Sequence, residues 1–329
     1  GYVRALTPPG FLGKASGSGR RELAQLIARA DNPLTARVLV NRVWQWIFGR
    51  GLVATPDDFG HLGENPSHPE LLDYLAGRFV AEGWSVKQLV RAVVLSRAFQ
   101  SAAAPTEEAR ERDPDNRLLA RAARYRLSSH SLRDQALFVS GLLVDKPGGP
   151  PVKPYQPPNI WEEMSFNKIR FEQDHGESLY RRSLYTFWRR TVGPPNLFDA
   201  ATRQVCVVKP SRTNTPLHAL TTLNDVTYAE AHRVLAERMM KEGGKNPANR
   251  ITFAFRLATS REPSAAESKV LLDAFERICK QYAGDRPAAE KVVAQGEKPR
   301  DTKLDVVELA AYTGVASVIM NLDEALTRE

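Results

Sequence analysis

Residues 32–49 read NPLTARVLVNRVWQWIFG, and they carry a clear signal of helical structure. Asn32 followed by Pro33 is typical of a helix start, because an amide side chain accepts hydrogen bonds from free backbone amides and proline fits the first turn. Apolar residues recur at helical spacing over 34–48, and Gly49 favours the end of the helix. The stretch therefore predicts an amphipathic helix rather than a strand.

The same spacing assigns the two faces of this helix. Val43, Trp46 and Ile47 suit the core. Arg42 and Gln45 are then expected on the outside. Nothing in the helix requires a cofactor.

Similar signals continue along the chain and predict a mainly α fold with little strand. A serine followed three residues later by Glu or Gln predicts a helix cap at 67–70, 85–88 and 264–267. Val, Ile and aromatic residues never alternate with period two over a long run, which disfavours strands. The remaining predicted helices cover residues 20–30, 71–81, 89–100, 113–126, 128–144, 216–240, 249–260, 268–282 and 304–326.

Proline and glycine mark the expected boundaries. Residues 1–19 hold two prolines and GKASGSG, which is typical of a linker. Residues 146–158 read KPGGPPVKPYQPP, and this composition excludes regular structure. We expect a helical subdomain over 20–145, a Pro-rich and basic-aromatic irregular segment over 146–215, and a second helical subdomain over 216–329. A single compact domain over 20–329 is the alternative.

The overall composition is that of a globular protein. Hydrophobic residues make up 42% and charged residues 26% of 329 residues. No apolar run reaches the ~20 residues needed to cross a bilayer. The net charge of +8 permits an acidic partner. Cys206 and Cys279 lack the spacing of a zinc or haem motif, and one disulfide or two separate thiols remain open. The chain begins with Gly1, from which we expect a fragment or processed form.

The most unusual segment is 181–224, RRSLYTFWRRTVGPPNLFDAATRQVCVVKPSRTNTPLHALTTLN. It holds seven Lys or Arg residues and one acid, Asp199. Guanidinium groups next to aromatic rings suit an acidic ligand such as an anionic polysaccharide. The alternative is a structural hub in which the arginines pair with Asp199 and Asp225 and cap backbone carbonyls. The residues predicted to bind the ligand are Tyr185, Trp188, Arg189, Arg190, Arg203, Arg212, Asn214 and His218.

The end of this segment combines a helix cap with a possible anion site. Thr215 and Pro216 favour a helix start, and the positive end of a helix attracts anions held by Arg212 and Asn214. His218, one turn into the helix, is either an acid or base facing the same site or an exposed histidine without a role.

A second polar cluster lies in the loop that contains His61, Glu64 and His68. Its spacing does not match the helical zinc pattern, and the prolines beside it forbid a continuous helix, so no metal site is predicted. The acidic pairs at 57–58 and 113–115 fit turns or helix starts better than paired catalytic carboxylates. No nucleophile elbow, phosphate loop or dinucleotide motif occurs, and a non-enzymatic role is favoured.

Three blocks of the sequence carry a resemblance to a known family. They are NPLTARVLVNRVWQWIFGRGLVATPDDFGHLGENPSHPELLDYLA at 32–76, the basic-aromatic block at 181–225, and RITFAFRLATSREPSAAE at 250–267. Together they resemble the domain-of-unknown-function family 1553, a C-terminal module of planctomycete-type surface or periplasmic proteins. The chain departs from that family at residues 129–131, where Ser-His-Ser replaces acidic residues and alanine.

The resemblance implies an exported protein at the periplasm or cell surface. It also implies neighbouring domains, among them a cytochrome-c-type haem domain nearer the N-terminus, while no cofactor is expected in this chain. No reaction or catalytic residue follows from it. We expect a binding or scaffolding module for an acidic ligand. The alternatives are a polysaccharide-acting enzyme that uses Asp199, His218 or the loop of His61 and His68, and a docking module for a haem-bearing domain. Export disfavours nucleic acid as a partner.

Overall fold

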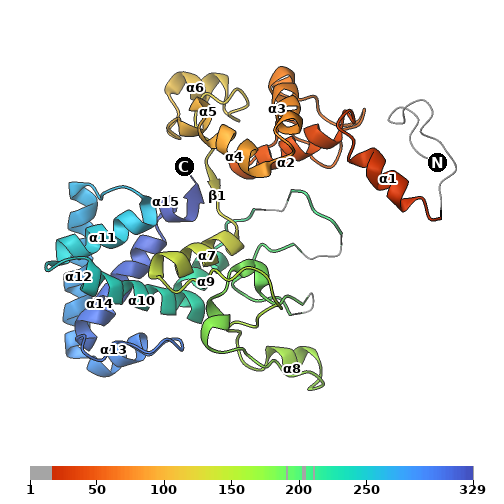
Figure 1. Cartoon of the computed structure of the whole chain (residues 1–329). Helices are drawn as coiled ribbons and strands as arrows, with labels where there is room; N and C mark the ends of the chain where they lie inside the picture. Colours follow the sequence, from red (N-terminus) through yellow and green to blue (C-terminus); the bar gives the residue numbers. More distant parts are fainter. Residues whose placement is uncertain (1–16, 190–191, 202–204, 210–211, 329) are drawn as a thin grey trace. The chain divides into compact units, whose positions relative to one another are not determined.

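The computed structural model describes residues 17–189, 192–201, 205–209 and 212–328, and its fold is mainly α, as predicted (Figure 1). The chain divides into two compact units, of which the first ends at Tyr125 and the second runs over Arg126–Arg328. In the described residues the one sheet pairs two-residue strands, β1 (Tyr125–Arg126) and β2 (Thr327–Arg328). The Pro-rich segment 146–158 lies inside the second unit.

The first unit is built around the packing of α2 on α3 and α4. Its core contains Val43 and Phe48 from α2, Phe79 from α3 and Val93 from α4. Trp44 stacks on Phe48 with ring centroids 4.3 Å apart, which joins two large apolar surfaces in that core. The helices are α1 (Arg20–Ile27), α2 (Thr35–Phe48), α3 (Pro69–Ala81), α4 (Val86–Val94), α5 (Arg97–Gln100) and α6 (Glu107–Arg112).

The end predicted for α2 at Gly49 is confirmed, whereas the helix begins at Thr35, with Pro33 outside it, and the predicted faces are partly wrong. Asn32 Oδ1 accepts from the backbone amides of Leu34 at 3.0 Å and Thr35 at 3.3 Å, and Gly49 adopts a left-handed φ of 78°. Gln45 is buried, whereas Trp46 is 60% exposed. Tertiary packing centres the buried stripe on Val43 and Trp44, which turns Trp46 outward.

Two of the three predicted caps are present. Ser85 and Ser264 accept hydrogen bonds at the starts of α4 and α12 (Ala265–Gly284), and Ser264 forms a full capping box with Glu267. The cap predicted at 67–70 is wrong, because α3 begins after His68 without a side-chain cap. Pro69 occupies the first turn, and the Ser67 hydroxyl lies 3.0 Å from His68 Nδ1 instead.

The second unit surrounds α14 with other helices. Leu309, Val315 and Ile319 of α14 are fully buried, and α10, α11, α12 and α13 pack around it (Figure 1). The helices are α7 (Ser129–Ser140), α8 (Ile160–Met164), α9 (Pro216–Asn224), α10 (Val226–Glu242), α11 (Pro247–Thr259), α12 (Ala265–Gly284), α13 (Arg286–Val293), α14 (Val306–Met320) and α15 (Asp323–Leu326), with 3₁₀ turns η2 (Gly176–Tyr180) and η3 (Ser183–Tyr185).

Two helices predicted as continuous are interrupted by side-chain caps. The helix predicted over 216–240 is two helices, α9 and α10, because the Asp225 carboxylate accepts from the Thr227 amide at 2.9 Å and starts a new helix. The helix predicted over 89–100 divides in the same way at Ser96, which caps α5. The side-chain oxygens of Asp225 and Ser96 accept backbone hydrogen bonds and so compete with those of one continuous helix.

The helix predicted over 113–126 is wrong, since most of this segment is irregular. The Asp113 carboxylate accepts from the amides of Arg117 at 2.7 Å and Leu118 at 2.8 Å. Asn116 and Leu119 have left-handed φ values of 50° and 58°. Asp113 therefore holds a turn where the sequence suggested a helix start.

The described part of segment 146–215 is mostly irregular, but it contains α8, η2 and η3, where no helix was predicted, and a buried arginine holds it to α7. Arg133 is fully buried, and its guanidinium donates to the carbonyl oxygens of Leu179 at 2.7 Å and Arg181 at 2.9 Å. Arg133 also lies 3.2 Å from the Ser183 hydroxyl. Irregular backbone lacks ladder partners, so a buried guanidinium can satisfy its carbonyls.

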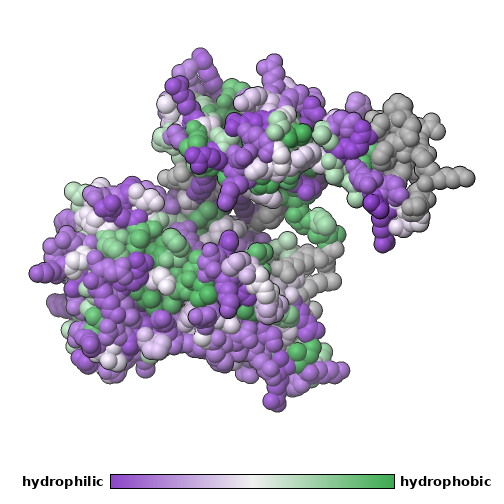
Figure 2. Space-filling view, in the orientation of Figure 1, coloured by the Kyte–Doolittle hydropathy of each residue, from purple (hydrophilic) through white to green (hydrophobic). Residues whose placement is uncertain are grey.

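Three further features are the surface hydropathy, the lengths of the helices and the state of the two cysteines. Hydrophilic residues cover much of the visible surface of both units, and hydrophobic residues form smaller patches (Figure 2). In the described chain, no helix combines the length and apolarity required to cross a membrane. Cys206 and Cys279 are both free thiols.

Candidate binding pocket in the first unit

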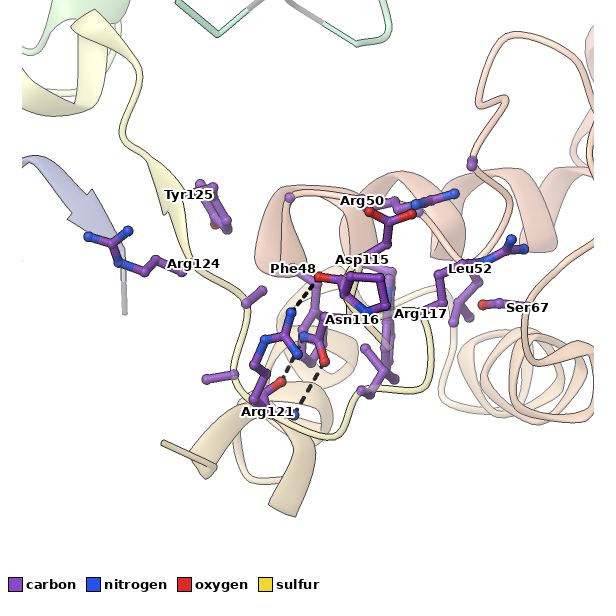
Figure 3. Close-up of a pocket in the computed structure, with 18 of the residues that line it drawn as sticks. Phe48, Arg50, Leu52, Ser67, Asp115, Asn116, Arg117, Arg121, Arg124 and Tyr125 are labelled. Carbon is purple, nitrogen blue, oxygen red and sulfur yellow. Dashed lines mark hydrogen bonds between the residues drawn. The ribbon is translucent and has the colours of Figure 1, made fainter. Parts of the chain in front are cut away.

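A pocket of about 350 Å³ opens in the first unit between the end of α2 and the irregular segment before β1 (Figure 3). It lies entirely within this unit. The lining residues are Trp44, Phe48, Gly49, Arg50, Gly51, Leu52, Ala54, Glu64, Asn65, Ser67, Pro114, Asp115, Asn116, Arg117, Leu119, Arg121, Ala122, Ala123, Arg124 and Tyr125.

The first wall follows α2 and is held in place by a buried asparagine of that helix. Asn41 is fully buried, and its side-chain amide donates to the Val53 carbonyl at 3.0 Å and accepts from the Val53 amide at 2.9 Å. Gly51 passes so close that a Cβ there would lie 2.5 Å from the Val53 carbonyl oxygen. Glycine is therefore required at position 51. This requirement restricts the backbone of residues 50–54 to the observed course along the pocket.

The second wall is the irregular segment that replaces the predicted helix. Arg121 donates through Nη2 to the Pro114 carbonyl at 2.6 Å (Figure 3). Its Nη1 donates to the Asp113 carbonyl at 3.1 Å. Asn116 donates from its side chain to the Arg121 carbonyl at 2.9 Å. Through these two Nη groups the Arg121 guanidinium fixes the position of the second wall.

Tyr125 closes the end of this wall. Its hydroxyl lies 2.8 Å from the Trp46 carbonyl oxygen and 3.1 Å from that of Ile47, in the last turn of α2. The carbonyls of a last helical turn lack helical partners, so the hydroxyl satisfies groups that would otherwise need water. These contacts tie the end of the second wall to the last turn of α2.

The charge of the pocket is positive. Four arginines and two acids line it, a formal balance of +2. Arg50 lies 3.8 Å from Glu64, a solvent-exposed pair of small energetic value. Arg117 is exposed, and its guanidinium has no ion-pair partner in the part of the chain that the structure describes. Among the four arginines that line the pocket, Arg117 is therefore the one best placed to bind an anionic ligand.

The base of the pocket is apolar. Phe48 and Leu52 are buried lining residues, and Leu119 adds a third, half-buried apolar side chain. An apolar base with a few charged groups at the rim is typical of a small-ligand site. This arrangement suits a ligand with an apolar face and an acidic substituent.

The residues predicted as a site in the basic-aromatic block lie in the second unit, and none lines this pocket. Arg190 and Arg203 lie outside the described residues. The Tyr185 hydroxyl accepts from the Gly148 amide at 2.7 Å, and the Arg181 guanidinium covers its ring at 3.9 Å. Tyr185 therefore has a structural role in the irregular segment.

The remaining members of that prediction are more accessible. Arg189 is exposed, and its guanidinium lies 5.4 Å from the Trp161 ring. Trp188 is half-buried, and Arg212 and Asn214 are exposed before α9. An anion site at these residues stays a prediction.

His218 is buried, which neither alternative anticipated. Its ring stacks on Phe198 with centroids 3.9 Å apart and an interplanar angle of 16°. Its Nδ1 accepts from the Thr215 amide at 3.4 Å, and so completes the start of α9. The side chain is held in a structural contact rather than presented as an exposed acid or base.

The other residues predicted as alternatives for catalysis do not lie together in one site. The Asp199 carboxylate accepts from the Ser129 amide at 3.0 Å and from the Ser129 hydroxyl, at the start of α7. His61 is exposed, and His68 contacts Ser67. Within the described ranges, no group of three or more His, Cys, Asp or Glu residues is placed to hold a metal ion.

Sequence reasoning missed the pocket, although it noticed both of its edges. The loop of Glu64 contains a cluster of polar residues, and the sequence favours a turn or a helix start at Asp113–Pro114, where the second wall begins. No local pattern shows that these segments meet across the end of α2. The usable signal was Pro114 beside two acids and an asparagine, which favours a turn over a long helix.

Comparison with known proteins gives a family but no characterised relative. A family model described as "PSD1: Protein of unknown function (DUF1553)" matches residues 19–275. No curated protein and no solved structure matches the chain. The matched range includes every residue that lines the pocket.

Proposed function

The chain belongs to DUF1553, a family of proteins of unknown function, and we propose that it is a binding module whose first unit holds an acidic sugar of an anionic polysaccharide. The observation that carries the proposal is the pocket with a balance of +2 and an arginine, Arg117, without an ion-pair partner in the described chain. As the resemblance implies, we place the module in an exported protein.

The chemistry of the pocket supports this ligand class. A planar guanidinium such as that of Arg117 forms two parallel hydrogen bonds to a carboxylate or sulfate. The apolar base at Phe48 and Leu52 offers a surface for the less polar face of a sugar ring. A pocket of about 350 Å³ is at the small end of the range for ligand sites, and suits one or two sugar units.

A binding titration tests the proposal directly. The purified chain would be titrated with hexuronate, sulfated and neutral oligosaccharides of equal length, each over a series of salt concentrations. We expect binding to the acidic oligosaccharides only, with affinity that falls as salt rises, because salt screens exposed charges. Absence of binding to every acidic oligosaccharide would overturn the proposal.

Three variants locate the site. Arg117→Ala should weaken binding by about ten- to a hundredfold, which corresponds to one lost charge-assisted hydrogen-bonding group. Arg112→Ala is the matched control, since Arg112 is an exposed arginine of the same unit that pairs with Glu108 and does not line the pocket. If Arg189→Ala abolishes binding and Arg117→Ala does not, the ligand binds the basic-aromatic block instead.

A further inference from the structure

A shallow groove of about 360 Å³ opens on the second unit beside α7. It shares no residue with the pocket of the first unit. Its residues come from α7, from the segment that follows this helix, and from the link between η2 and η3. They are Asp134, Gln135, Phe138, Leu143, Asp145 and Arg182.

Backbone hydrogen bonds hold the parts of the groove in place. Gly141 ends α7 with a left-handed φ of 80°, and the amide of Leu143 then donates to the Leu137 carbonyl at 2.9 Å. The amide of Val144 donates to the Tyr180 carbonyl at 3.0 Å. These bonds tie the segment after α7 both to that helix and to the end of η2.

Asp134 is an acid of the groove whose charge is already compensated. Its Oδ1 accepts from the Ser183 amide at 2.7 Å, and its Oδ2 lies 3.6 Å from Nε of Arg182. The guanidinium of the buried Arg133 lies 4.0 Å from Oδ1. Asp134 therefore holds Arg182 beside α7 and does not offer a free charge to a ligand.

Asp145 carries the uncompensated charge of the groove. It is exposed, and among the described residues its carboxylate has neither an ion-pair partner nor a hydrogen-bond partner. Two acids and one arginine give the lining a formal balance of −1, opposite in sign to the net charge of +8 of the whole chain. The groove attracts a cation at short range, because salt screens exposed charges more than about 10 Å away.

Phe138 supplies an accessible aromatic ring. It is 67% exposed, and it follows Asp134 and Gln135 by one helical turn on the same face of α7. Leu143 adds a half-buried aliphatic side chain. A groove that combines an exposed ring with a free carboxylate suits a basic side chain, because its stem packs on apolar surface while its charged end stays solvated or paired.

We propose that this groove is a docking site for a basic segment of a partner protein, from which it receives one lysine or arginine side chain. The stem of that side chain packs on Phe138 and Leu143, and its charged end pairs with Asp145. The charge of the lining carries this choice, since an acidic ligand would be repelled by Asp145 and an uncharged one would gain nothing from it. The site is independent of the acidic ligand of the first unit.

A peptide titration of the whole chain tests the docking site. End-blocked pentapeptides Gly-Ala-Xaa-Ala-Gly would carry lysine, arginine, norleucine or glutamate at the centre, and NMR would follow the ring signals of Phe138. A basic peptide should shift these signals saturably at roughly millimolar concentration, because one exposed ion pair and one cation–π contact are each weak. The norleucine peptide keeps an apolar stem without the charge and should bind about fivefold more weakly. The proposal is wrong if neither basic peptide saturates, or if the norleucine or glutamate peptide binds equally well.

Matched variants locate the binding. Asp145→Asn and Phe138→Ala should each weaken binding of the basic peptide about two- to fivefold. Glu276→Gln and Val270→Ala are the controls, because these exposed residues of α12 do not line the groove. All four substitutions are at exposed positions, so the fold should be kept. Undiminished binding by the Asp145→Asn variant would contradict the proposal.

Two further titrations separate this groove from other binding. The Arg117→Ala variant should bind the basic peptide as the unchanged chain does, so failure of the acidic-sugar pocket would leave this result intact. A trisaccharide of glucosamine presents a protonated amine on a sugar instead of a peptide. If it binds more tightly than both basic peptides and loses that binding in Asp145→Asn, the groove is a sugar site and the protein partner is ruled out.

Discussion

The carboxylate of Glu230 lies 3.7 Å from the guanidinium of Arg233, and both side chains are only 1% exposed. Glu230 also accepts from the hydroxyls of Tyr155 at 3.1 Å and Tyr180 at 3.0 Å, and from the Lys298 amide at 2.7 Å. These bonds connect α10 to the irregular segment and to the loop after α13. Burial and the nearby Glu230 charge raise the pKa of both tyrosines, which stay protonated and donate.

We predict that Glu230→Gln destabilises the second unit by roughly 3 kcal/mol, because it leaves part of the buried Arg233 charge uncompensated. Urea denaturation measures the change in the free energy of unfolding. Glu242→Gln is the control, since Glu242 pairs with Arg238 at 2.9 Å on the surface, where such a pair contributes about 0–1 kcal/mol. Equal effects of the two substitutions would contradict the central role of the buried pair.

A second prediction concerns Gly296, which lies against Glu230. Its φ is 82°, and a Cβ built there would lie 2.1 Å from the carboxyl carbon of Glu230. Gly296→Ala should therefore destabilise the protein by at least about 2 kcal/mol through backbone strain and displacement of Glu230. Gly77→Ala, inside α3 with nothing near its Cβ, should instead stabilise by about 0.5–1 kcal/mol. Thermal or urea unfolding that shows no difference would refute this.

The neutral state of His232 predicts a pH dependence of stability. Its pKa falls from its usual value near 6.5 to about 4 on folding because of burial. Between these values the unfolded chain binds a proton that the folded chain does not, so stability is complete above pH 6.5 and falls as the pH drops towards 4. The loss attributable to this residue is on the order of 3 kcal/mol.

His232→Gln isolates this contribution, because glutamine does not titrate. Urea denaturation between pH 7.5 and 4 should show a shallower loss of stability in the variant than in the unchanged chain. His61→Gln, at an exposed position, should keep the slope of the unchanged chain. Parallel slopes for His232→Gln and the unchanged chain would show that His232 titrates normally.

The last prediction separates the charge of the pocket from the shape of its wall. Arg121→Lys keeps the positive charge but cannot reproduce the two guanidinium bonds to Asp113 and Pro114. Affinity for an acidic oligosaccharide should fall about tenfold, with little change in its salt dependence. Arg117→Lys should reduce affinity less than Arg117→Ala while it preserves the salt dependence. If the variant Arg121→Lys binds the oligosaccharide as tightly as the unchanged protein, the second wall does not depend on the two guanidinium hydrogen bonds.

The helical class, several helix ends and the family can be predicted from the amino-acid sequence alone. Asn32 and Gly49 bound α2, and Ser264 with Glu267 starts α12, because caps depend on atoms within a few residues of one another. The prolines of residues 146–158 predict a stretch without regular structure, and the structure has no helix there. These features are local, and local chemistry can be read along the chain.

Which side chains come into contact depends on how distant parts of the chain pack together. Tyr125 binds carbonyls 78 and 79 positions earlier, and Arg133 binds carbonyls 46 and 48 positions later. The pocket and the burial of Glu230 with Arg233 depend on such distant contacts. No periodicity encodes them, because a side chain is buried or exposed according to what packs over it, as Gln45 and Trp46 show.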